Sequence, residues 1–189
     1  EMCIRDSPNT AFAVASMGEP LSFSDTMVTS TPDLNPIKAF VFCGQGPQHE
    51  HMGVHMYTRF AAFRNSVNAS FEMVAKFHKK NFQDEYGLFN PELNGKVAKT
   101  DKGDWKVECI VIAITIFQIA LFDLWVDLGV QPDVVLGHSV GEIAAMYASG
   151  ALTHEKAIRT AIARSNALSL LDTIDGQMAA LGMSLSLIH

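Results

Sequence analysis

The sequence contains little cysteine and no long hydrophobic run. Cys3, Cys43 and Cys109 are widely spaced and form no C-x-x-C pair, which favours reduced thiols over a disulfide framework or a zinc site. Reduced thiols of this kind predict a cytoplasmic protein. The longest apolar run, residues 110–122, is shorter than the roughly 18 to 20 residues that a membrane span requires. We therefore expect it to be a buried core element, and we expect no membrane partner.

Basic residues are also few. Lys and Arg number 14 against 20 Asp and Glu, which gives a net charge of -6, and the acidic residues are scattered rather than clustered. This balance excludes partners that require a basic surface, such as nucleic acid or an anionic membrane. With 48% hydrophobic and 18% charged residues, a chain of this length can bury the core of one domain.

The hydrophobic pattern predicts an α/β domain. Residues 1–36 are rich in Ser, Thr, Pro and Asp without a sustained period, so we interpret them as a linker or a non-native lead-in and assign the domain to residues 37–189. A β-prone run at residues 38–46 ends in a glycine-rich turn, and residues 134–136 are typical of a buried strand. Helical spacing and end signals predict helices over residues 53–77, 108–128, 139–149 and 153–171. Strands that alternate with helices favour a parallel sheet.

The stretch VVLGHSVGEIAAM contains a candidate nucleophile. Its G-H-S-V-G segment satisfies the G-x-S-x-G elbow, with a predicted strand before Ser139 and a helix after it. Such a turn exposes the serine hydroxyl, and the helix N-terminus offers amides to a developing oxyanion. The alternative is an ordinary capping box between Ser139 and Glu142. A catalytic serine also needs a base, yet His154 and His189 alone follow the elbow, and strand alternation predicts that the His138 side chain points away from Ser139.

A second glycine-rich turn, FVFCGQGPQ, lies at residues 40–48. Closely spaced glycines after a strand let backbone amides face a ligand, so this turn can supply oxyanion donors together with the elbow. The alternative is that it is a common connecting turn. His49, His51, His55 and Glu50 follow it, and we interpret these as surface residues at a helix start and predict no metal site.

Arg164 is predicted to lie on the apolar face of the last helix. The spacing of Ala157, Ala161, Arg164 and Leu168 places its guanidinium on that face, where it needs an anionic partner. An internal acid such as Asp172 or Asp175 is one candidate. A substrate carboxylate, held in the bidentate geometry that arginine favours, is the other.

Taken together, these three features resemble the acyltransferase domains of polyketide synthases, most closely the fungal type, and the related malonyl-CoA:acyl carrier protein transacylases. The family motifs stand here as FVFCGQGPQ and GHSVGE, and an arginine follows the serine at the family's spacing of twenty-five residues. The resemblance covers residues 38–184. It implies a parallel-sheet, α/β-hydrolase-like core with a nucleophile elbow, of which the small ferredoxin-like subdomain would only begin in this chain.

The resemblance also implies site roles. Ser139 would take a malonyl-type acyl group from coenzyme A, main-chain amides of Gln45 and Val140 would form the oxyanion hole, and Arg164 would bind the malonyl carboxylate. The aliphatic Val140 leans toward malonyl over methylmalonyl. The acceptor would be the phosphopantetheine thiol of an acyl carrier protein, with other synthase domains as further partners and no tightly bound cofactor.

Two departures from the family accompany these roles. Many relatives place an active-site glutamine at the position of Val111, and Gln118, on the same helical face, is a possible substitute. Gln118 and His138 are both predicted to line the pocket. The family's catalytic histidine lies much further along than the fifty residues that follow Ser139 here. We therefore expect an N-terminal piece of the domain with little turnover by itself. The alternatives are a serine hydrolase such as a thioesterase, or a catalytically inactive piece of a synthase.

Overall fold

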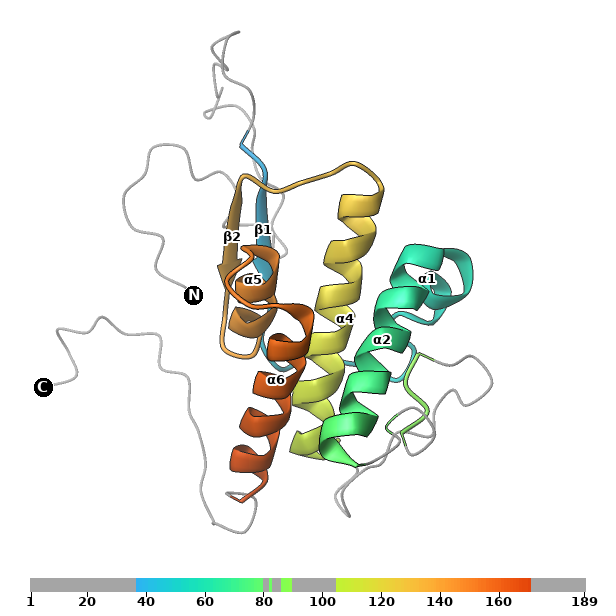
Figure 1. Cartoon of the computed structure of the whole chain (residues 1–189), viewed down its shortest axis with the longest axis vertical. Coiled ribbons are helices and arrows are strands. Elements are labelled where there is room, and N and C mark those ends of the chain that lie inside the picture. The colour runs from blue at the N-terminus through green and yellow to red at the C-terminus, as the bar shows by residue number, and fades with distance from the viewer. Residues whose placement is uncertain (1–36, 80–81, 83–85, 90–104, 171–189) are drawn as a thin grey trace, which may run out of the picture. The chain divides into compact units, whose positions relative to one another are not determined.

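The computed structural model describes residues 37–79, 82, 86–89 and 105–170 (Figure 1). These residues belong to one compact unit, Ile37–Asp175. The predictions made for residues 1–36 and 171–189, and for most of the connection between residues 81 and 106, fall outside the described residues. Everything below concerns the described part of the chain.

Two parallel strands and five helices build this part of the chain. The strands are β1 (Ala39–Phe42) and β2 (Val134–Gly137), and they pair in parallel with Ala39 opposite Val134 and Phe42 opposite Gly137. The helices are α1 (Val54–Arg59), α2 (Ala61–His78), α4 (Val107–Asp127), α5 (Gly141–Ala148) and α6 (His154–Ser169). The predicted parallel α/β class is confirmed, as are the helices expected from the sequence at residues 108–128, 139–149 and 153–171.

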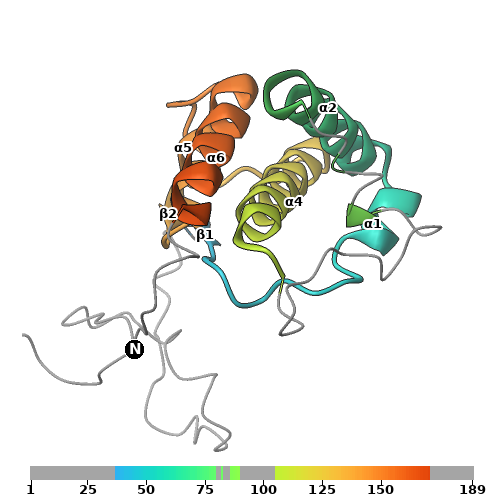
Figure 2. The ribbon, with the colours of Figure 1, turned by 90° about the horizontal axis from the view of Figure 1, so that it is seen from below.

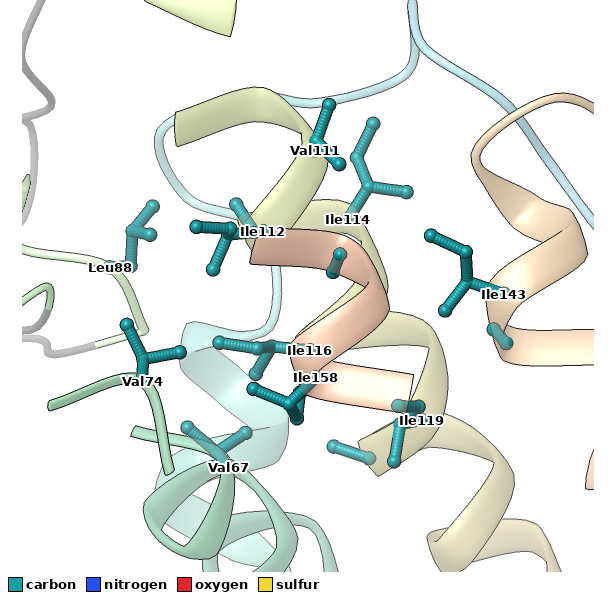
Figure 3. Packing of buried hydrophobic residues seen from close by; sticks show 14 of the residues in the cluster. Val67, Val74, Leu88, Val111, Ile112, Ile114, Ile116, Ile119, Ile143 and Ile158 are labelled. Carbon is teal, nitrogen blue, oxygen red and sulfur yellow. The ribbon is translucent and has the colours of Figure 1, made fainter. Parts of the chain in front are cut away.

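Helix α4 is the centre of the core. In Figure 2 it lies between α2 and α6, and its other side meets α5 and the sheet. It is apolar on every side, as expected of a helix that is surrounded by neighbours. Figure 3 shows the aliphatic packing at this junction, where side chains of α4 such as Ile112, Ile116 and Ile119 meet Val67 of α2 and Ile158 of α6.

The length of α4 exceeds the apolar run seen in the sequence. At 21 residues and a mean hydropathy of 2.3, it is long and apolar enough to cross a membrane by those two criteria. However, 67% of its most hydrophobic window is buried inside the protein. Packing against α2, α5 and α6 therefore accounts for its composition, as the sequence prediction of a core element requires.

Helices α5 and α6 form an antiparallel hairpin (Figure 1). The ring of Tyr147, near the end of α5, lies 5.4 Å from the ring of His154, the first residue of α6. Thr153 caps α6, because its side chain accepts a hydrogen bond from the Lys156 amide. The hairpin returns the chain toward the start of α5, so that residues far along α6 reach the β2–α5 turn.

The prediction of one continuous helix over residues 53–77 is wrong, because the chain forms two helices there. The chain breaks at Phe60, whose φ of -115° and ψ of 117° are extended, and this separates α1 from α2. Arg64 stabilises the break because its Nη1 donates to the carbonyl oxygens of Tyr57 at 2.9 Å and Thr58 at 3.3 Å. The apolar spacing continues across the break, so periodicity alone could not reveal it.

Strand β2 was predicted to be buried, and this is also wrong. Its outward residues Val134 and Leu136 are 45% and 52% exposed, and Val41 on β1 is 63% exposed. The opposite face carries Phe40 and Phe42, which pack against α4. The described helices cover only the face that carries Phe40 and Phe42. In the described part of the chain, the other face of the sheet is therefore aliphatic and exposed.

Candidate active site

Ser139 lies in a sharp turn between β2 and α5. Its φ is 52°, in the left-handed region that a residue with a Cβ adopts at a cost. The flanking glycines make the turn possible. A Cβ on Gly137 would lie 2.5 Å from the Cα of Glu142, and a Cβ on Gly141 would collide with the carbonyl oxygen of Phe42. Both glycines therefore relieve crowding, as the elbow motif predicts.

The glycine-rich turn after β1 lies directly against this elbow. The amide of His138 donates to the Phe42 carbonyl at 2.9 Å. A Cβ on Gly44 would meet the His138 ring at 2.9 Å and the Cβ of Ser139 at 3.2 Å. The exposed Gln45 follows Gly44 in the same turn. The two glycine-rich segments, nearly a hundred residues apart in the sequence, thus meet at the candidate nucleophile.

Arg164 contacts the same serine from α6. Its Nη2 donates a hydrogen bond to Ser139 Oγ at 3.2 Å. Its Nε is buried and has no hydrogen-bond partner in the structure. The acids considered as internal partners, Asp172 and Asp175, lie outside the described residues. The guanidinium therefore lies beside the hydroxyl with donor capacity that this contact leaves unused.

The capping-box alternative for Ser139 is wrong. The N-cap of α5 is Val140, and no side chain caps this helix end. Val140 is completely buried, and its main chain begins the helix immediately after the serine. The Ser139 side chain points instead to Arg164. The positive end of the α5 dipole is consequently adjacent to the serine, and Glu142 is the acidic residue in the first turn of the helix.

Gln118 and His138, the two possible pocket residues, differ in position. Gln118 is 5% exposed and helps to line an apolar cavity of about 170 Å³ between β1 and α4. The lining of this cavity does not include His138, which is exposed and lies against Gly44. Val111 is fully buried two helical turns before Gln118. Of the three, Gln118 combines burial with a polar group beside the two turns.

A partly buried polar network, which the sequence reasoning missed, joins four helices. Asp123 of α4 accepts hydrogen bonds from Ser66 of α2 at 2.6 Å and from Tyr147 of α5 at 2.8 Å. His154 Nε2 of α6 lies 2.8 Å from the hydroxyl of Ser70. Burial, reinforced by Asp123, raises the pKa of Tyr147, whereas burial lowers the pKa of His154 against the opposing effect of Asp123. The signal that could have revealed this network is an isolated acid inside an apolar helix.

A general base for Ser139 is not among its partners in the described chain. Arg164 is the side chain that hydrogen-bonds Ser139 Oγ there. His154 is engaged with Ser70 instead, and His189 lies outside the described residues. The arrangement therefore places a serine hydroxyl beside a cationic side chain and a helix N-terminus.

Metal ligands do not gather in the described ranges. No three His, Cys, Asp or Glu side chains come together there as a possible metal site. His49, His51 and His55 are exposed around the start of α1.

Comparison with known proteins gives a consistent result. The family model described as acyl transferase domain matches residues 39–187. The highly reducing polyketide synthase stpks1 of Strobilurus tenacellus is 36% identical over 148 residues, which span 78% of this chain and 5% of that protein. The acyltransferase domain of the polyketide synthase PpsC of Mycobacterium tuberculosis has a TM-score of 0.58 at 28% identity, over 70% of this chain and 37% of that one.

A malonyl-CoA:ACP transacylase of Synechocystis sp. shares the fold, with a TM-score of 0.57 at 24% identity over 71% of this chain and 41% of that one. This chain thus spans less than half of these two solved structures and less than a tenth of the first two curated relatives. The solved structures agree with the fold described above.

Proposed function

Because the chain belongs to the acyl transferase domain family, we propose that it forms the N-terminal part of a domain that loads malonyl groups in a polyketide synthase. The domain would take a malonyl-type acyl group from coenzyme A and pass it to the phosphopantetheine thiol of an acyl carrier protein. Ser139 would carry the acyl group between the two thiols as an ester.

The observation that carries this proposal is the hydrogen bond from Arg164 to Ser139 Oγ at 3.2 Å. A malonyl thioester has a carboxylate two carbons from its reacting carbonyl. A guanidinium that binds this carboxylate would hold the carbonyl within reach of the adjacent hydroxyl. The buried and unpartnered Nε of Arg164 offers a further donor for such an anion.

The reaction would take place in two exchanges at Ser139. Its Oγ attacks the thioester carbonyl, the carbon–sulfur bond breaks, and coenzyme A leaves as a thiol with the serine proton. The carrier's thiol then attacks the seryl ester, the carbon–oxygen bond breaks, and the proton returns to the serine. In each exchange the carbonyl oxygen becomes negative, and amides of Gln45 and Val140 would stabilise it. The base would come from the later part of the domain, as the family resemblance implies.

A serine hydrolase is the second candidate that the elbow permits. A hydrolase of simple esters or thioesters has no use for a cation beside its nucleophile. The Arg164 contact and the family match both favour transfer to a thiol over transfer to water. Malonyl-CoA, a carrier protein and neighbouring synthase domains are accordingly the proposed partners.

The test replaces Arg164 with Ala in the complete domain that contains this chain. We expect the rate of malonyl loading onto Ser139 to fall about 10- to 100-fold, because a charged hydrogen bond contributes about 1.5 to 3 kcal/mol. Acetyl loading should change much less, because an acetyl group has no free carboxylate for Arg164 to bind. The loading rates are measured by intact mass spectrometry after rapid mixing with each acyl-CoA.

The matched control is Arg159→Ala. Arg159 lies on the same helix but is exposed, where it contacts Glu155 and the ring of Phe77. It should leave both loading rates unchanged. Equal losses of malonyl and acetyl loading in Arg164→Ala would identify a structural arginine. Release of free malonate at the same rate with and without carrier protein would instead identify a hydrolase.

A further inference from the structure

Gln118 makes an unusual contact inside the apolar helix α4. Its Nε2 donates to the carbonyl oxygen of Cys43 at 2.7 Å and lies 3.2 Å from the sulfur of the same residue. Its Oε1 is buried and has no hydrogen-bond partner in the structure. The amide thus uses one end to hold a main-chain carbonyl from the other side of the core, seventy-five residues away.

The carbonyl that Gln118 holds lies where three elements meet. Cys43 directly follows β1 and opens the glycine-rich turn. A Cβ on Gly141, the first residue of α5, would lie 2.6 Å from the Cys43 carbonyl oxygen. The next residue, Gly44, packs against the Cβ of Ser139. The position of this carbonyl therefore sets where the turn leaves β1 in relation to the elbow.

Burying the Gln118 amide inside α4 lowers the stability of the fold. Its contact with the Cys43 carbonyl is therefore better explained by the position that it fixes. An unsatisfied buried acceptor such as Oε1 destabilises the folded protein, because it gives up its hydrogen bond to water without a replacement. A methionine of similar volume would avoid that cost and suit the apolar surroundings. It could not donate to Cys43, however. A buried polar group of this kind is justified by the position it fixes.

We propose that Gln118 is a positioning residue for the oxyanion hole. By holding the Cys43 carbonyl, it fixes the turn that carries Gln45 and so keeps the Gln45 amide directed at the acyl carbonyl above Ser139. This inference rests on the proposed function. It assigns Gln118 a contact with the protein main chain and with no part of the substrate.

The first test is Gln118→Met in the complete domain. The acylation rate of Ser139 in a single turnover with malonyl-CoA should fall about 10- to 100-fold, because a misdirected oxyanion donor loses much of its effect. The KM for malonyl-CoA should stay within about twofold, because Arg164 still binds the carboxylate. The midpoint of thermal unfolding should change little, because removal of the unpaired Oε1 acceptor offsets the loss of the donor to the Cys43 carbonyl. A loss of rate without a loss of stability separates positioning from general packing.

The matched control is Thr115→Val. Thr115 lies in the same helix, is fully buried, and donates its hydroxyl to the carbonyl of Val111 within α4. The substitution is close in shape and touches neither turn, so the acylation rate should stay near that of the wild type. Equal rate losses in Thr115→Val and Gln118→Met would overturn the inference, because both would then report the packing of α4.

Gln118→Glu supplies a second and independent test. This test remains available if Gln118→Met does not fold. Its carboxyl can donate to the Cys43 carbonyl only when protonated. The ratio of its acylation rate to that of the wild type should therefore rise toward one as the pH falls. A ratio that stays equally low at every pH would overturn the inference.

The wild type separates the two proposals. If wild-type enzyme does not acylate Ser139, the proposed function fails whatever residue 118 is. If it does acylate Ser139 and Gln118→Met does so at the same rate, the proposed function stands and the positioning role of Gln118 is refuted.

Discussion

At the scale of single residues, the backbone of Ser139 is the most constrained feature of the site. A positive φ of 52° costs a residue with a Cβ about 1 kcal/mol, whereas glycine adopts it freely. The turn thus keeps the hydroxyl beside Arg164 and Gly44 at some expense in stability. Strain of this kind is common where a side chain must be exposed for chemistry.

Replacing Ser139 with Gly and with Ala separates strain from chemistry. Both variants lose the hydroxyl and its contact with Arg164, so both should abolish acyl loading in the complete domain. Ser139→Gly should be more stable than Ser139→Ala by about 1 kcal/mol, because it alone relieves the left-handed strain. Urea unfolding of the two purified variants measures the difference. Equal stabilities would show that the turn is not strained in solution.

The sequence predicted some of these residues and not others, for a physical reason. Ser139 is visible because a motif with local geometry surrounds it, and Arg164 because its spacing puts a charge on an apolar helix face. The partner of Gln118 was not predictable, since Cys43 comes close only through the packing of β1 on α4. Local patterns reveal which side chains are available, and tertiary packing decides what they touch.

At the scale of elements, the close approach of α5 to β1 builds the site. The main chain of Gly141 contacts the carbonyl oxygens of Phe42 and Cys43 with no room for a side chain. The helix N-terminus is therefore pressed against the end of the strand. Helix propensity gives no hint of this, because glycine is a poor first residue by propensity alone.

Gly141→Ala should destabilise the chain by about 3 kcal/mol or more, because the new methyl group collides with main-chain atoms that cannot turn away. Gly150→Ala is the matched control. Gly150 has a positive φ of 79° and open space around it, so it should cost about 1 kcal/mol from strain alone. Thermal or urea unfolding of both variants gives the comparison. Similar losses would mean that α5 can move away from β1 at little cost.

The break between α1 and α2 marks the limit of prediction for elements. A continuous apolar stripe predicted one helix, and the sequence at Phe60 contains neither Gly nor Pro. The guanidinium of Arg64, in the first turn of α2, satisfies carbonyls at the end of α1, and this side-chain capping takes the place of a Gly or Pro signal. The long helix α4 was predicted well because no side chain interrupts its backbone hydrogen bonds, so the apolar pattern and the helix coincide.

At the scale of the whole molecule, the network of Asp123, Tyr147 and His154 ties α4, α5 and α6 together and joins them to α2. The fold class could be predicted, because the alternation of strand and helix patterns is a property of the entire chain. The exposed outer face of the sheet could not, since aliphatic strand residues give the same pattern whether or not another layer covers them.

The network predicts a pH dependence of folding. Burial lowers the folded-state pKa of His154 below its ordinary value of 6.5. As the pH falls through that value, His154 is protonated in the unfolded chain but stays neutral in the folded protein. The free energy of unfolding therefore decreases, by at most about 1.4 kcal/mol per pH unit. The decrease ends once the pH is below the folded-state pKa. His154→Gln should flatten the curve of unfolding free energy between roughly pH 7 and pH 5, and an unchanged slope would contradict this.

The antiparallel hairpin of α5 and α6 also limits how this gene segment can change in length. One codon inserted within α6 ahead of Arg164 would turn the guanidinium by about 100° around the helix axis and away from Ser139. A codon inserted in the connection between residues 149 and 153 would leave the register of both helices intact. Natural variants should therefore tolerate insertions and deletions in that connection, and rarely within the first ten residues of α6.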